Sequence, residues 1–78
     1  MEFKTREEAL AAITKFMEER NLPTNWVRVP WLSEYYHCDV FSNYIAPQQV
    51  PNQLTDYGDH FELYADCECI NFWYGSKS

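Results

Sequence analysis

Residues 61–73 read FELYADCECINFW, and this stretch decides the fold that we predict for the chain. Side chains of a strand alternate between its two faces, so an extended segment here separates two kinds of residue. The apolar row consists of Phe61, Leu63, Ala65, Cys67 and Cys69. The opposite row consists of His60, Glu62, Tyr64, Asp66 and Glu68. The pattern therefore predicts one long strand with a buried apolar face and an exposed acidic face.

Acidic charge is concentrated in the same half of the chain. The formal net charge of the 78 residues is −6. Residues 1–31 carry five basic and five acidic side chains, whereas residues 32–78 carry one basic and seven acidic side chains. Such a surface repels nucleic-acid phosphates and anionic membranes, and it attracts basic protein surfaces. We therefore expect a protein partner, with no direct contact to nucleic acid and none to a membrane.

Residues 5–20 have the pattern of an amphipathic helix. Its apolar stripe consists of Leu10, Ile13, Phe16 and Met17. Thr5 followed by Glu8 forms a capping box, in which each side chain accepts a hydrogen bond from the other residue's free backbone N–H. Asn21 suits the left-handed position after the last turn, and Pro23 prevents continuation. The sequence thus defines both ends of this helix.

The rest of the chain has the composition of strands and loops. Residues 24–30 predict a short edge strand closed by Pro30. Residues 34–45 are rich in aromatic and β-branched side chains and predict a second strand, with a helix capped by Ser33 as the alternative. Residues 46–59 predict a loop that ends in a turn before the long strand. The order predicts a single α+β domain, residues 1–78, with the N-terminal helix packed on a small antiparallel sheet of about three strands.

The cysteines and histidines are candidates for a metal or catalytic site. On a strand, Cys67 and Cys69 hold their sulfur atoms further apart than a tetrahedral zinc site requires, and buried free cysteines behave as small apolar side chains. We therefore predict no metal, no cofactor and no enzymatic activity. The alternative is a small enzyme or metal-binding module that uses His37, His60 and the cysteines, including Cys38.

The acidic row is the predicted contact surface. Carboxylates on one face of a strand recur at multiples of about 6.6 Å, which is close to the spacing of phosphates along a nucleic-acid strand. Tyr57 and Tyr64 lie beside them in the sequence and supply the aromatic anchors typical of protein interfaces. The predicted partner-binding residues are Glu62, Asp66, Glu68, Tyr64, Asp56, Asp59, Tyr57, Glu34 and Asp39. The competing interpretation is a solvated strand face whose acid only maintains solubility.

These observations predict a small acidic inhibitor that has no catalytic activity. It would bind a basic host protein or nucleoprotein complex that handles nucleic acid, and block it by mimicking nucleic-acid charge. In size, charge and lack of catalytic motifs the chain is similar to phage-encoded anti-CRISPR and anti-restriction proteins, a similarity of composition and not of motif. The alternative outside enzymology is an assembly subunit that self-associates through surface aromatic residues.

Location follows from what the sequence lacks. The N-terminus has no apolar signal segment, no apolar run is long enough to span a bilayer, and the three cysteines are an odd number. We expect a monomer or small homo-oligomer in a reducing cytoplasm, that of the host cell if the protein is viral.

Overall fold

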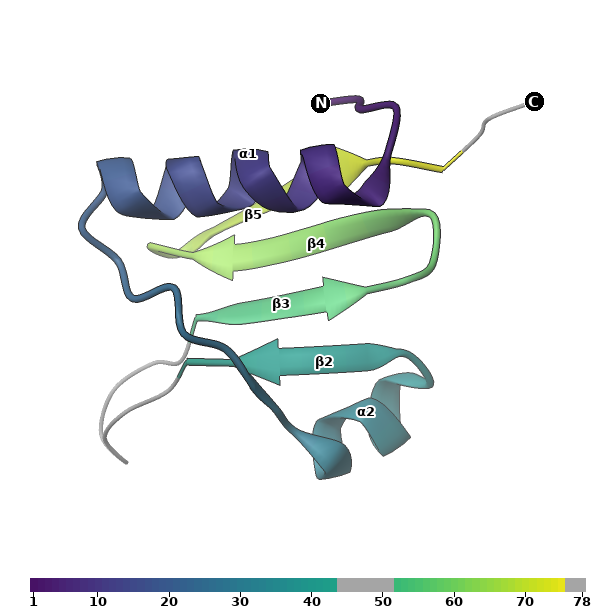
Figure 1. Cartoon of the computed structure of the whole chain (residues 1–78). Helices are drawn as coiled ribbons and strands as arrows, with labels where there is room; N and C mark the ends of the chain where they lie inside the picture. Colours follow the sequence, from purple (N-terminus) through teal and green to yellow (C-terminus); the bar gives the residue numbers. More distant parts are fainter. Residues whose placement is uncertain (44–51, 76–78) are drawn as a thin grey trace.

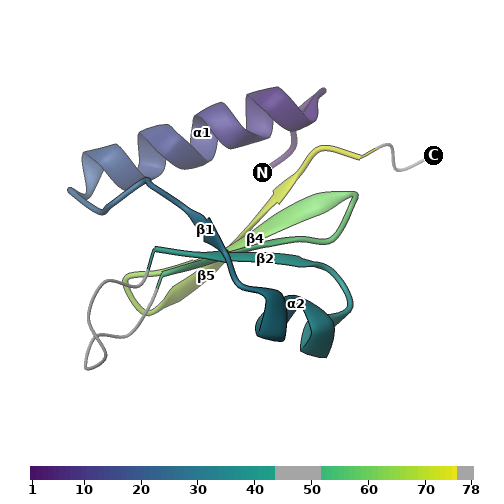
Figure 2. The same ribbon diagram turned by 60° about the horizontal axis from the view of Figure 1, so that its bottom comes forward.

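The structure is a computed structural model that describes residues 1–43 and 52–75 of the chain. Its elements are, in order, α1 (Arg6–Glu19), β1 (Val27–Arg28), α2 (Pro30–Tyr36), β2 (Asp39–Ser42), β3 (Gln53–Asp56), β4 (His60–Ala65) and β5 (Glu68–Trp73). The strands form one antiparallel sheet in the order β1-β2-β3-β4-β5. Helix α1 covers one face of the sheet, and α2 lies beside β2 on the other side (Figures 1 and 2). The predicted α+β class is confirmed, with five strands in the described residues instead of about three.

Both predicted ends of α1 are confirmed. The side chain of Thr5 accepts the backbone N–H of Glu8 at 3.1 Å, while the Glu8 carboxylate accepts the N–H of Lys4 at 3.0 Å and not that of Thr5. At the other end Asn21 has a φ of 58°, and the N–H of Leu22 donates back into the last turn at 2.9 Å. This pattern is a Schellman motif, which satisfies the terminal carbonyl groups of the helix.

Strand register divides the side chains of the sheet between two faces, because directly opposed residues of an antiparallel pair share a face. The face against α1 carries the core residues Leu54, Phe61, Leu63, Ala65 and Phe72, which pack with Ala9, Ile13 and Met17 of the helix. The other face, called the open face below, carries Gln53, Thr55, His60, Glu62, Tyr64, Cys69, Asn71 and Trp73. Any functional side chain of the sheet must therefore be assigned to one of these two faces.

The prediction of one long strand over residues 61–73 is wrong. The chain reverses at Asp66 and Cys67, whose φ angles are 55° and 61°, so that Ala65 pairs with Glu68. Two consecutive residues with positive φ are typical of the type I′ turn that joins tightly connected strands. Phe61, Leu63 and Ala65 are buried as expected, but the second half of the stretch is a separate strand that pairs back on the first.

The prediction of a strand beginning at residue 34 is also wrong, because α2 precedes a shorter β2. Pro30 occupies the first helical turn, where its missing N–H breaks no hydrogen bond. His37, with a φ of 60°, ends the helix. The Ser33 hydroxyl does not cap α2; it donates to the Val29 carbonyl and accepts the Val40 N–H, each at 3.1 Å. The bond from Val40 attaches α2 to β2.

The predicted loop over residues 46–59 is interrupted by β3, so that part of the prediction is wrong. Residues 46–51 lie outside the described residues. The predicted turn before the next strand is confirmed: Tyr57 donates its N–H to the His60 carbonyl at 3.0 Å, and Asp56 accepts the N–H of Gly58 at 3.0 Å. The predicted short edge strand is confirmed as β1, which ends the described sheet on one side.

Candidate protein-binding surface

The predicted acidic row does not exist on one face of the sheet. Glu62 lies opposite Asn71 on the open face, whereas Glu68 lies opposite Ala65 and therefore on the face against α1. Asp66 is in the turn between β4 and β5. The chain reversal is the reason, since it changes which residues share a face. The regular phosphate-like spacing expected for these carboxylates is therefore wrong.

Two other predicted contacts, Asp39 and Asp56, are paired with arginines. They lie directly opposite each other on β2 and β3, where two negative charges would repel. Arg6 of α1 donates to Asp56 Oδ2 from Nε at 3.1 Å and from Nη2 at 2.9 Å. Arg28 Nη2 lies 3.6 Å from Asp39 Oδ1. Each carboxylate thus has its own basic partner within the fold.

The Asp56 carboxylate is bound by groups of the fold itself. Burial on its own would raise the pKa of Asp56, but hydrogen bonds from Tyr74, Gly58 and Arg6 outweigh burial and lower that pKa below its usual value. The hydroxyl of Tyr74 donates to Asp56 Oδ1 at 2.5 Å. Burial, together with this hydrogen bond and the negative charge, raises the pKa of Tyr74 to about 12. We therefore do not include Asp56 in the candidate surface.

Three stacked rings occupy one end of the open face. The rings of Tyr57 and His60 are 4.7 Å apart at 11°, and those of His60 and Trp73 are 4.1 Å apart at 24°. Two carboxylates flank them: the Tyr57 hydroxyl donates to Glu62 Oε1 at 3.3 Å, and His60 Nδ1 lies 2.6 Å from Asp59 Oδ1. The sheet register places these residues together, because His60 and Trp73 are a directly opposed pair.

Exposed aromatic side chains continue from this end of the sheet onto α2. Six large hydrophobic side chains are exposed among the described residues, and five of them lie on β1, on α2 or at Tyr57. Trp31 and Tyr35 are 73% and 76% exposed, and their spacing of four places them on one side of the helix. Tyr36 packs edge-on against Tyr35, with centroids 5.2 Å apart. We call Trp31, Tyr35, Tyr36 and Tyr57 the aromatic surface.

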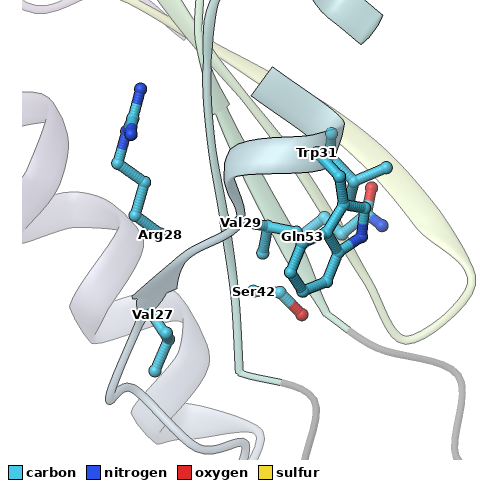
Figure 3. A pocket seen from close by; sticks show the side chains of 7 residues that line it. Val27, Arg28, Val29, Trp31, Ser42 and Gln53 are labelled. Carbon is cyan, nitrogen blue, oxygen red and sulfur yellow. The ribbon is translucent and has the colours of Figure 1, made fainter. Parts of the chain in front are cut away.

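A groove lies next to Trp31. It has a volume of about 330 Å³ and is lined by Val27, Arg28, Val29, Trp31, Leu32, Ser42 and Gln53. Figure 3 shows the indole of Trp31 near Ser42 and Gln53, while the side chain of Arg28 points away from the indole. The apolar side chains that line the groove suit an apolar side chain of a partner, and Ser42 and Gln53 add polar groups to its lining.

Negative charge surrounds the aromatic surface. The described lysines and arginines lie on the N-terminal segment, on α1, directly after α1 or on β1, and none lies on α2 or on β2 to β5. Within the described residues, Glu34 and Glu62 have no ion pair with lysine or arginine. Burial raises the pKa of Tyr57, and the charge of Glu62 raises it further. The local potential therefore favours a positively charged ligand.

Sequence reasoning found some of this surface and missed the rest. Tyr57 and Glu34 are exposed as predicted contacts should be, and Glu62 and Tyr64 lie on the open face. Trp31, Tyr35 and Tyr36 were missed because they were assigned to a connection and a strand. The readable signal was Pro30 at a helix start followed by aromatic residues four apart.

The structure separates Cys67 from His60 within the alternative catalytic or metal site. Cys67 and Cys69 are exposed at one end of the β4–β5 hairpin, so the prediction that they are buried is wrong. His60 lies at the other end of β4, four residues from Tyr64, which pairs with Cys69; this is about 13 Å at about 3.3 Å per residue. Cys38 is half-buried beside β2. Within the described ranges, no three His, Cys, Asp or Glu side chains are grouped so that they could hold a metal ion.

Comparison of the chain with protein-family models, with curated proteins and with solved structures found no match. Neither helix of the described residues is long and apolar enough to cross a membrane. The functional argument therefore starts from the aromatic surface and its charge.

Proposed function

We propose that this chain is a non-catalytic protein that binds a basic, nucleic-acid-handling protein through the aromatic surface and blocks it. The observation that carries the proposal is the exposure of Trp31 and Tyr35, each more than 70% accessible. A domain of this size needs most of its large apolar side chains in the core, so few can be left exposed without a use. Contiguous exposed tryptophan and tyrosine side chains are typical of the centres of protein interfaces.

Charge determines the kind of partner. All of the net charge of −6 comes from residues 32–78, which include most of α2 and all of β2 to β5. A basic protein surface is complementary to this charge and would associate faster at low salt. Proteins that grip phosphates expose such lysine and arginine surfaces, and an acidic protein bound there would exclude the nucleic acid.

Self-association is the competing use of the same aromatic side chains. Two copies would bring the same acidic surface together, and like charges across an interface are unfavourable. This repulsion favours a foreign basic partner over a second copy of the chain.

Site-specific cross-linking tests the proposal. A photoreactive amino acid is placed at Trp31 or Tyr35, with a matched control at Glu18, which is exposed on α1 at the opposite side of the sheet. After illumination in extract of the cells in which the protein is made, we expect products with a basic protein from the first two positions and not from Glu18. The purified partner should lose nucleic-acid binding when the protein is added at equal concentration.

Two results would contradict this proposal. Equal products from all three positions would show that the aromatic surface is not the contact, and products formed only between copies of the chain would favour the assembly subunit.

A further inference from the structure

We infer that Tyr57 and Glu62 form a subsite for an arginine side chain of the basic partner. This inference rests on the proposed function and names the chemistry by which one part of the surface selects its ligand. It would distinguish arginine from lysine, which charge attraction alone does not do.

The ring of Tyr57 is stacked on one side and partly exposed to solvent. His60 covers one face, with the two rings almost parallel and 4.7 Å apart. Tyr57 is nevertheless 43% exposed, so solvent reaches a large part of its side chain. A guanidinium group is planar and weakly hydrated, and it stacks on an aromatic ring in this way. An arginine here would add one more layer to the stack of Tyr57, His60 and Trp73.

Glu62 supplies the matching charge. The Tyr57 hydroxyl donates to Glu62 Oε1 at 3.3 Å, which holds the carboxylate next to the edge of the ring. No lysine or arginine of the described residues forms an ion pair with Glu62. A guanidinium stacked on the ring can direct N–H groups toward the carboxylate at its edge, because its donors lie in the plane of the group.

The surroundings are negative at this point. Burial raises the pKa of the Cys38 thiol, and the charges of Asp39, Asp56 and Glu62 raise it further. The pKa of Tyr57 is raised by burial and then by Glu62. Burial opposes a charge of either sign, but the part of both shifts that comes from nearby carboxylates favours a positive charge near Tyr57. The backbone of Tyr57 is held in position, because its N–H donates to the His60 carbonyl at 3.0 Å.

The subsite can be tested with peptides of matched length. The ¹⁵N-labelled protein is titrated with (Gly-Ser-Arg)₄, with (Gly-Ser-Lys)₄ and with the same peptide containing citrulline, which keeps the planar shape and loses the charge. We expect the arginine peptide to bind about threefold or more tightly than the lysine peptide, as a stacked guanidinium predicts. The shifted amides should centre on Tyr57 and Glu62, and the citrulline peptide should bind weakest.

Three variants decide the assignment. Tyr57→Leu and Glu62→Gln should each remove the preference for arginine over lysine. Glu68→Gln, which removes one carboxylate from the opposite face of the sheet, should retain the preference. The dispersion of the amide spectrum checks that each variant is folded. If Tyr57→Leu does not fold, Glu62→Gln still tests the subsite.

The outcomes separate this inference from the proposed function. Equal binding of arginine and lysine peptides at the aromatic surface would overturn the arginine subsite and leave the proposed function in place. Equal loss of the preference in Glu68→Gln would also overturn the subsite. Peptide shifts centred on α1, with none on the aromatic surface, would contradict both.

Discussion

Arg6 on α1 and Asp56 at the end of β3 are joined by two hydrogen bonds to one carboxylate oxygen, at 3.1 and 2.9 Å, across 50 positions of sequence. The guanidinium of Arg6 also lies over the ring of Phe61, 5.1 Å from its centre. The pair therefore fixes the first turn of the helix over the core. It uses a carboxylate that the sequence alone assigns to a binding surface.

The first prediction concerns this pair. Asp56→Ala should lower the free energy of unfolding by about 2 kcal/mol, because it leaves Arg6 and the half-buried Tyr74 hydroxyl without their acceptor. Glu68→Ala, which removes an exposed carboxylate, should change it by less than about 0.5 kcal/mol. Urea unfolding measures both values. Equal stability of the two variants would show that the pair does not hold the helix on the sheet.

The second prediction is the pH dependence that Asp56 causes. Its pKa in the folded protein is lowered from 3.8, so the unfolded chain takes up the proton first as the pH falls. The stability that this carboxylate contributes is complete above about pH 5 and is lost as the pH falls below 4 toward the folded pKa. Asp56→Asn should show a smaller loss over that range in urea unfolding. A loss as steep as that of the unmodified protein would contradict the assignment.

The third prediction concerns Tyr74. Its pKa is raised to about 12, because burial and the bond to Asp56 oppose ionisation of the phenol. The folded protein should therefore show a tyrosinate absorbance step near pH 12, above the usual value of 10.0. Tyr74→Phe should lack that step. If the step persists in Tyr74→Phe, another tyrosine produces it.

The fourth prediction concerns the cysteines. Cys67 and Cys69 are exposed, while Cys38 is half-buried and its pKa is raised by burial and by nearby carboxylates. A thiol reagent that reacts with thiolates should modify two groups quickly and the third slowly, because only the thiolate reacts. Cys38→Ser should remove the slow phase alone. Three equal rates would contradict the hairpin that exposes the first two.

Helix α1 is well encoded in local signals. Thr5, Glu8 and Asn21 mark the ends of α1 through hydrogen bonds that involve only neighbouring residues. Such signals require no knowledge of the tertiary fold, which explains why the helix and the α+β class could be predicted.

The hairpin was missed because its turn lacks the usual residues. A type I′ turn favours Asn and Gly, whereas this one contains Asp66 and Cys67. The readable signal was a change of parity: the buried side chains before the turn are odd-numbered, while Ile70 and Phe72 after it are even-numbered. A two-residue turn produces this change, because residues three apart then become opposed and share a face.

The aromatic surface depends on information that is not local. Trp31 and Tyr35 are aromatic residues of the kind that favours strands and cores. They are exposed here because of where α2 lies beside β2. Whether Asp39 and Asp56 are paired likewise depends on arginines that other elements bring beside them. The sequence therefore shows the acidic character of residues 32–78, but not which carboxylates share a face of the sheet or pair with arginine.

The account depends most on the aromatic surface as the contact, and affinity for the cross-linked partner tests it directly. Calorimetry would measure the Kd of two double variants. One combines Trp31→Ala and Tyr35→Ala, and the control combines Glu18→Gln and Glu19→Gln, which alter only exposed α1 residues. We predict that the aromatic substitutions raise Kd by about 30-fold or more, as loss of interface hot spots does, and that the α1 substitutions change it little. Equal effects of the two double variants, or a larger effect on α1, would contradict the account.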